Sequence, residues 1–138
     1  MGFMDKVKAA AKNADSKAGE EIDKGKYKSK ISDERKKITE AYEQIGKKYY
    51  DGFKDGAIPE EELKALCDEI DQSFANIAEY EKTIVEIEEK GKAEREKNNA
   101  EAEAAARERA EAKAAARAER EAKKAEEANK AEDDSKAA

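Results

Sequence analysis

The chain has no histidine and no tryptophan, and it contains one cysteine, Cys67, and one proline, Pro59. Without histidine it lacks the side chain that serves most often as a general base and as a transition-metal ligand. One cysteine can form neither an internal disulfide nor a structural zinc site. We therefore expect a protein that is not an enzyme and that needs no cofactor.

Strand-forming residues and long apolar runs are also scarce. Valine and threonine occur at two positions each, so we expect no β-sheet. No apolar run approaches the roughly 18 residues that would span a bilayer, and the first residues lack the apolar core of a signal peptide. These absences predict a cytoplasmic protein, with peripheral contact at the inner face of the membrane as an added hypothesis.

Charge and alanine are abundant instead. Charged residues make up 46% of the chain, and such a composition with helical apolar spacing is typical of long helices and coiled coils. Residues 1–54 carry 14 basic and 10 acidic residues, net +4, and residues 55–91 carry 3 and 12, net −9. Residues 92–138 carry 12 and 13, net −1. The sequence therefore predicts an all-α protein in which a basic segment precedes an acidic one.

Two segments, 27–50 and 59–90, place apolar residues at helical spacing. In the second, Leu63, Ile70, Ile77 and Ile84 lie seven residues apart, which is the heptad spacing of a coiled coil. Because the two segments have opposite charge, we expect them to fold back on each other. Residues 21–91 are thus predicted to form an antiparallel coiled-coil helical hairpin with its turn at 51–58.

The apolar seam of this hairpin is also expected to hold several copies of the chain together. About 13 large apolar side chains stabilise a lone hairpin only marginally against the entropy cost of ordering it. A homo-oligomer is therefore expected, with Cys67 as a buried or half-buried thiol beside the seam. The predicted interface residues are Ile38, Tyr42, Ile45, Tyr49, Leu63, Leu66, Ile70, Phe74, Ile77, Tyr80, Ile84 and Ile87.

Residues 1–20 are predicted to form a short amphipathic N-terminal helix, with a hinge between Gly19 and Gly25. Lysines accompany its apolar face, which suggests contact with a membrane surface. The large apolar residues that would make this contact are Phe3, Met4 and Val7. The alternative is that the helix rests on the rest of the protein.

Residues 92–138 contain no apolar side chain larger than alanine. Their approximate ten-residue repeat keeps no helix face from one repeat to the next, which argues against a coiled coil. We expect the apolar pattern to end at Gly91 and a long charged single helix, surrounded by solvent, to cover 92–131. It should fray to a disordered end near Asp133; a partly helical linker is the alternative.

The stretch "DGFKDGAIPEEEL" at 51–63 allows two interpretations. Asp51, Asp55 and Glu62 match positions of the twelve-residue EF-hand loop, so residues 51–62 are an alternative calcium-binding module. Phe53, however, stands at a ligand position and has no ligand oxygen. As a turn, Gly52 would end one helix in the left-handed conformation, and Pro59, capped by Ile58, would begin the next. We favour the turn.

A second alternative function is weak nucleic-acid binding through the basic first helix. Its basic residues flank Tyr27, but a net charge of −6 and the acidic second helix oppose a dominant basic face. We therefore expect nucleic acid to be an unfavoured partner. The lysines concerned are Lys24, Lys26, Lys28, Lys30, Lys36, Lys37, Lys47 and Lys48.

Three stretches carry a resemblance to a family. They are "MGFMDKVKAAAKNADSKAG", "ISDERKKITEAYEQIGKKYYDGFKDG" and, after a turn with proline, "EEELKALCDEIDQSFANIAEYEKTIVEIEE". Residues 1–91 resemble the N-terminal helical region of small, poorly characterised bacterial proteins, many of which end in a zinc ribbon. The ribbon is absent here, so zinc binding is not carried over. The resemblance implies a bacterial cytosolic protein with a coiled-coil hairpin, and the sequence as a whole predicts a helical scaffold or adaptor.

Overall fold

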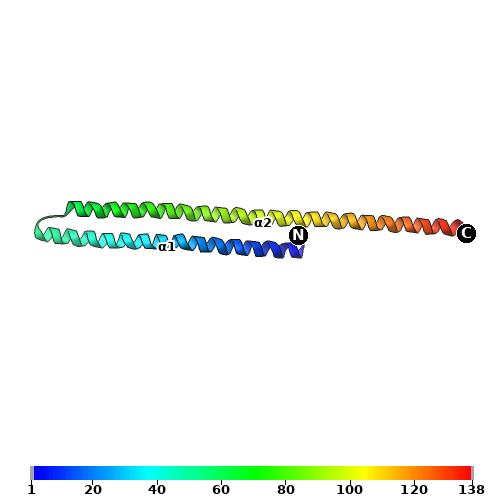
Figure 1. The fold of residues 1–138 in the computed structure, drawn as a ribbon, viewed down its shortest axis with the longest axis horizontal. Helices are drawn as coiled ribbons and strands as arrows, with labels where there is room; N and C mark the ends of the chain where they lie inside the picture. Colours follow the sequence, from blue (N-terminus) through cyan, green and yellow to red (C-terminus); the bar gives the residue numbers. More distant parts are fainter. Residues whose placement is uncertain (1, 138) are drawn as a thin grey trace. The chain divides into compact units, whose positions relative to one another are not determined.

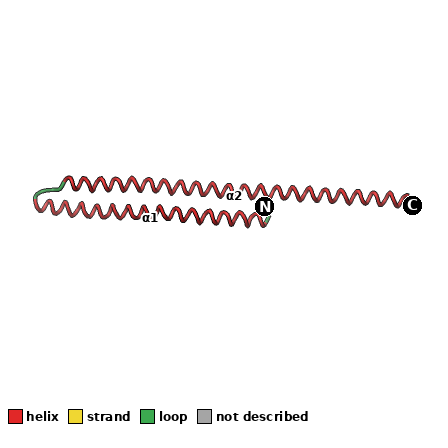
Figure 2. Tube along the Cα trace, in the orientation of Figure 1, coloured by secondary structure: helices red, strands yellow, loops and turns green. Residues whose placement is uncertain are grey.

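The computed structural model describes residues 2–137, which form two helices and no strand. α1 spans Phe3–Asp55 and α2 spans Glu60–Ala137, and a short loop joins them (Figures 1 and 2). The prediction of an all-helical protein is confirmed. The two helices pack against each other, an arrangement consistent with a hairpin.

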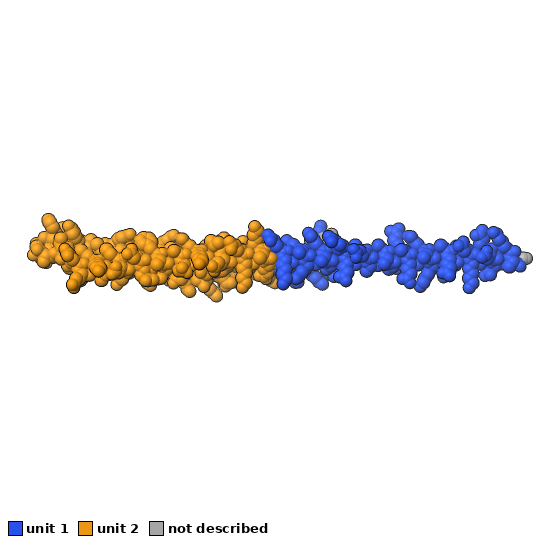
Figure 3. Space-filling model, turned by 90° about the horizontal axis from the view of Figure 1, so that it is seen from above, with its two compact units in different colours: residues 1–13, 95–138 blue, residues 14–94 orange. Residues whose placement is uncertain are grey.

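The chain divides into two compact units, which Figure 3 colours separately. Unit 2 comprises residues 14–94 and contains the loop. Unit 1 comprises residues 1–13 and 95–138. This division differs from the predicted boundaries at residues 20 and 91, because the first residues of α1 pack on a part of α2 that we expected to stand alone.

The core of unit 2 is a single seam between the two helices. Its buried members are Ile31, Ile38 and Ala41 from α1 and Leu66, Ile70 and Ile77 from α2. Ile45, Tyr80 and Ile84 pack against this cluster while staying partly exposed. Most of these residues recur at the seven-residue spacing seen in the sequence, since that spacing returns a side chain to the same helix face.

α1 ends in a Schellman motif, and the residue that ends it is Gly56. The Ala57 N–H donates to the Gly52 carbonyl at 2.9 Å, and the Gly56 N–H donates to the Phe53 carbonyl at 3.3 Å. Gly56 has φ of 78°, which favours glycine. The prediction that Gly52 takes the left-handed conformation is therefore wrong; Gly52 lies one turn earlier, within the helix.

Gly52 is needed for a different reason, which is the close approach of the loop. A Cβ atom at this position would lie 2.5 Å from the Ala57 carbonyl oxygen and 2.7 Å from Cδ of Pro59. α2 then begins at Glu60, one residue later than predicted, and the Pro59 carbonyl accepts from the Leu63 N–H at 3.0 Å. Pro59 rather than Ile58 thus occupies the cap position, where its missing N–H leaves no donor unpaired.

The predicted hinge between Gly19 and Gly25 is absent, because α1 is helical without interruption from Phe3 to Asp55. Each glycine in a helix interior costs about 1 kcal/mol relative to alanine. Packing along the helix can outweigh that cost, and seam residues such as Glu20 and Lys24 occupy inward positions between the two glycines. The amphipathic N-terminal segment is therefore the first part of α1 and not a separate helix.

In unit 1, residues of α2 that we predicted to be surrounded by solvent pack on the start of α1. Ala9 and Asp5 are buried, and Ala102 and Ala105 are half-buried. From the ten-residue repeat we wrongly expected no residue after Gly91 to pack on another helix. A shared face is not needed along the whole repeat, because α2 contacts α1 only as far as Arg109. Side chains of residues 110–137 are exposed, and α2 remains helical to Ala137 instead of fraying near Asp133.

Candidate interaction surfaces

One side of the unit 2 seam is polar and holds a buried carboxylate. Glu34 is only 6% exposed, and its partners are Ser73, Lys37 and Asn76. The hydrogen bond from Ser73, joined by those from Lys37 and Asn76, lowers the pKa of Glu34 below its ordinary value against the opposing effect of burial. A hollow of about 290 Å³ lies beside this carboxylate and is lined entirely by charged, polar and small side chains.

Acid should destabilise the helix pair partly through Glu34. Because the pKa of Glu34 is lower in the folded chain, its contribution to stability is present above the ordinary carboxyl pKa and is lost as the pH falls through the folded value. Glu34→Gln should therefore flatten the decline in the free energy of unfolding as the pH falls below about 4.5. Urea unfolding across this range measures it, with exposed Glu43→Gln as the control; identical curves for both variants would contradict the assignment.

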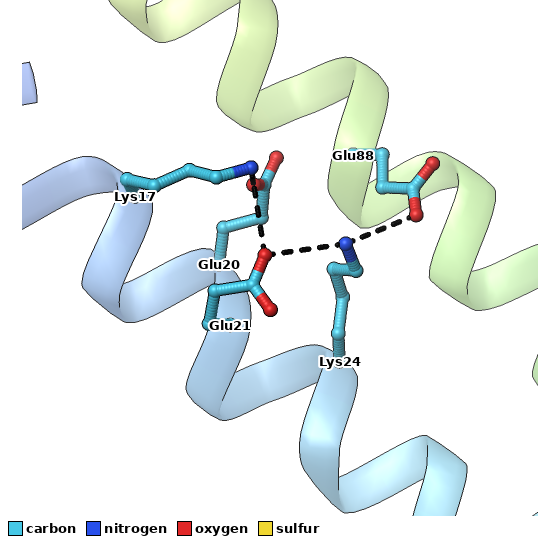
Figure 4. A network of polar contacts seen from close by, with 5 residues as sticks. All are labelled: Lys17, Glu20, Glu21, Lys24 and Glu88. Atoms are coloured by element: carbon cyan, nitrogen blue, oxygen red, sulfur yellow. Dashed lines mark hydrogen bonds and ion pairs between the residues drawn. The ribbon is translucent and has the colours of Figure 1, made fainter.

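An ion-pair network links the two helices of unit 2 at Lys24 (Figure 4). Its ammonium lies 3.1 Å from Glu88 of α2 and 3.4 Å from Glu21 of α1. Lys17 extends the network along α1 through Glu20 at 2.7 Å and Glu21 at 3.4 Å. The bond to Glu88, followed by that to Glu21, raises the pKa of Lys24. This lysine therefore acts as a contact between the helices.

Several lysines of the predicted nucleic-acid patch have such internal partners. Lys48 pairs with Glu62 at 2.8 Å, Lys37 with Glu34 at 3.2 Å, and Lys26 with Asp23 at 4.0 Å. Lys30 lies over the rings of Tyr27 and Tyr80. These contacts use part of the positive charge that phosphate groups would need.

The predicted interface residues fall into three groups by exposure. Ile38, Leu66, Ile70 and Ile77 are buried. Leu63, Ile87 and the three residues that pack on the core are half-buried. The aromatic residues Tyr42, Tyr49 and Phe74 are exposed by half or more.

Cys67 is also exposed, which corrects the expectation of a buried or half-buried thiol. It follows the seam residue Leu63 by four positions, so its side chain lies beside the seam and not within it.

The predicted membrane residues all lie on the surface of unit 1. Phe3 is 79% exposed, and Met4 and Val7 are also exposed. The opposite side of this segment is held to α2 by polar contacts. Asp5 pairs with Arg109 at 2.8 Å, and Asn13 bonds to Asn99 at 2.8 Å.

The geometry at 51–62 is not that of an EF-hand loop. Asp51 and Asp55 belong to α1 and Glu62 to α2, so only residues 56–59 are non-helical where the calcium site needs a twelve-residue loop. Glu62 is engaged by Lys48. Among residues 2–137, no cluster of histidine, cysteine, aspartate or glutamate could hold a metal ion.

Sequence reasoning overlooked the polar residues on the inward faces of the helices, which are Glu20 and Glu34 in unit 2 and Asp5 and Asn13 in unit 1. Asp5, Glu20 and Glu34 are buried, and Asn13 is half-buried. The sequence contained part of the information needed to predict Glu34. Glu34 and Ala41 follow Tyr27 at intervals of seven residues, which places all three on one helix face. Polar seam residues specify the register of paired helices more than they stabilise them.

Comparisons with family models, with curated proteins and with solved structures found no match to this chain. The resemblance of residues 1–91 to bacterial helical proteins thus stays a prediction. Within residues 2–137, neither helix contains a segment that is apolar enough over a sufficient length to cross a bilayer.

Proposed function

We propose that this protein is a non-enzymatic scaffold, in which α1 and α2 of unit 2 form an antiparallel coiled coil that associates with a second copy. Contacts between the helices support the antiparallel pairing. Lys24 meets Glu88, Tyr27 meets Tyr80, and Lys48 meets Glu62. Residue numbers thus rise along α1 as they fall along α2.

The heptad pattern divides the helix pair into two flanks. Each helix has a first row of seam residues seven apart, which is Ile31, Ile38 and Ile45 in α1 and Leu63, Ile70, Ile77 and Ile84 in α2. A second row of seam positions follows each of these by three residues. Residues that follow the first row by four lie about 40° from it, on the side away from the second row. In an antiparallel pair these positions of both helices fall on one flank. The ion pair between Lys24, seven before Ile31, and Glu88, four after Ile84, supports this assignment. We call it the apolar flank; it holds Tyr42, Tyr49, Cys67 and Phe74.

The single observation that carries the proposal is the exposure of three aromatic side chains on this flank. Tyr42 is 55% exposed, Phe74 51% and Tyr49 50%. These three residues lie next to the row of isoleucine and leucine side chains in the seam. The hollow beside Glu34, with its polar lining, lies on the other flank. Aromatic residues are enriched in protein interfaces, so the contrast between the two flanks supports this one as the face that meets a partner.

A second copy of the chain is the partner that fits this flank best. Farther along it, α1 contributes Lys28 and Arg35 and α2 contributes Glu81 and Glu88. A flank with both signs of charge can complement itself, as a two-fold interface requires. In addition, no large side chain among residues 2–137 is fully buried, so association would complete a seam that one chain leaves partly open.

The test is to place charge on the apolar flank. Tyr42→Lys/Phe74→Lys should abolish association, which we expect in the natural chain at about micromolar concentration because the patch is small. Ile22→Lys/Val85→Lys adds the same charge at exposed apolar residues outside this flank, so it should associate like the natural chain. Sedimentation equilibrium measures the association, and circular dichroism confirms that the variants stay helical.

Two outcomes contradict the proposal. A natural chain that stays monomeric up to millimolar concentration excludes self-association as its role. Equal loss of association in both double variants shows instead that added charge, and not the apolar flank, controls it.

A further inference from the structure

We infer that unit 1 carries a composite contact site for an anionic lipid surface, built from the first residues of α1 and from residues 106–113 of α2. The first observation is the orientation of the N-terminal segment. Phe3, Met4 and Val7 are exposed, whereas Asp5 and Ala9 are buried. The segment therefore turns its polar and small residues inward and its large apolar residues outward.

Helix geometry places these two sets on opposite sides. At 100° per residue, Asp5, Ala9 and Asn13 centre on one direction, and Phe3, Met4 and Val7 centre about 160° away. Lys6 lies between the two faces on one side, and Lys8 and Lys12 lie between them on the other. An outward apolar stripe with lysines on both borders is typical of a helix that lies in a membrane surface.

Polar contacts and small alanine side chains, and no large apolar residue, hold the segment on α2. Asp5 Oδ1 lies 2.8 Å from Arg109 Nη1, and the Asn13 side chain bonds to both Asn98 and Asn99. Packing of this kind leaves the apolar face free for a partner. If the segment served only to pack on α2, burying Phe3, Met4 and Val7 would have stabilised it more.

α2 contributes the second half of the site. A groove of about 340 Å³ lies between the start of α1 and this helix. Its lining combines apolar side chains with two cations and with Asp5, which pairs with Arg109: Phe3, Met4, Asp5, Ala106, Ala110, Arg109 and Lys113. Arg107 lines an adjoining hollow together with Glu103.

The charge of the site indicates which kind of surface it binds. The segment from residue 2 to residue 13 carries three lysines and one aspartate, and Arg109 already neutralises that aspartate. Residues 106–113 of α2 add Arg107, Arg109 and Lys113 against Glu108 and Glu111. Apolar side chains that reach the level of the headgroups, with an excess of cations beside them, fit the phosphates of anionic lipids. This site does not depend on self-association, because the apolar flank lies in unit 2.

Vesicle sedimentation with the full chain tests the inference. The chain should bind vesicles of equal parts phosphatidylglycerol and phosphatidylcholine and should not bind phosphatidylcholine alone. Phe3→Ser/Met4→Ser should weaken binding about tenfold or more, because both side chains are exposed and would lose their contact with the lipid. Circular dichroism should show unchanged helix content.

The α2 half of the site is tested by charge reversal. Lys113→Glu should weaken binding at least about fivefold, since one basic residue near an anionic surface contributes about that factor. Lys124→Glu makes the same change farther along the exposed part of α2 and should keep binding within about twofold. Arg109 is left intact because it holds Asp5.

Three results would overturn the inference. The first is no binding of the natural chain to the anionic vesicles. The second is equal loss in Lys113→Glu and Lys124→Glu, which would mean that overall charge, and not a site, governs binding. The third is a change of oligomeric state in Phe3→Ser/Met4→Ser without a change in vesicle binding, which would assign the apolar face to a second copy of the chain.

Discussion

Replacing Gly52 with alanine should lower the free energy of unfolding by about 1–3 kcal/mol, the range for forcing an extra carbon into a filled space. The new Cβ would lie 2.5 Å from the Ala57 carbonyl oxygen and 3.2 Å from Cα of Ile58. Both are backbone atoms, so no side chain can rotate away to relieve the overlap. The loop would have to move, and the bond from the Ala57 N–H to the Gly52 carbonyl would weaken with it.

Gly46→Ala is the matched control for this substitution. Gly46 is an exposed residue of the same helix, and nothing lies within 4 Å of the position its Cβ would take. Here alanine should raise the free energy of unfolding by about 0.5–1 kcal/mol through its better helix propensity. Urea unfolding compares the two; opposite signs are expected, and a stabilising Gly52→Ala would show that the loop does not approach α1 this closely.

Truncating Ile38 to alanine should cost about 2–5 kcal/mol, the usual range for removing a large aliphatic side chain from a core. Ile38 is only 7% exposed, and it belongs to the cluster that also contains Ile70 and Ile77. The cluster has only six buried members, so each one contributes a large share of the buried apolar surface. The loss should therefore be a large fraction of the total stability.

Ile22→Ala provides the control, since Ile22 lies on the same helix but is 62% exposed. Its free energy of unfolding should stay within about 0.5 kcal/mol of the natural chain. Thermal and urea unfolding at a protein concentration below the association range measure both variants. Comparable losses at Ile38 and Ile22 would contradict the assignment of the seam.

Seam positions filled by isoleucine and leucine could be predicted from the sequence, because a seven-residue spacing of apolar side chains has one simple structural meaning. The same spacing filled by charged or small residues gives no such signal. Glu34 and Ala41 were therefore missed although both are buried. In the structure Glu34 is tolerated because Ser73, Lys37 and Asn76 satisfy its carboxylate.

Unit 1 was harder to predict for a related reason. Its contacts come from Ala9, Asn13, Asn98 and Arg109, none of which is a large apolar residue. Small side chains allow two helices to approach, but alanine is equally common in helices surrounded by solvent. The apolar residues of the segment suggested membrane contact, with packing on the rest of the protein as the alternative. The partners of Asp5 and Asn13 show which face of the segment lies against α2.

The single cysteine gives the most direct measurement of the central claim, association through the apolar flank. Cys67 is exposed and lies among the aromatic residues of this flank. The pairings of Lys48 with Glu62 and of Tyr27 with Tyr80 put it between the levels of Tyr49 and Phe74. In a two-fold assembly a residue near the centre of the patch meets its own copy. A short bismaleimide should therefore join two natural chains at Cys67 into a covalent dimer.

The control moves the thiol off the flank. Cys67→Ser/Val85→Cys carries one exposed thiol at a position outside the apolar flank and should give little covalent dimer under the same conditions. Dimer yield by denaturing gel electrophoresis is the readout. A high yield at Cys67 and a low yield at position 85 is the predicted result, and equal yields, or none at Cys67, would contradict association through this flank.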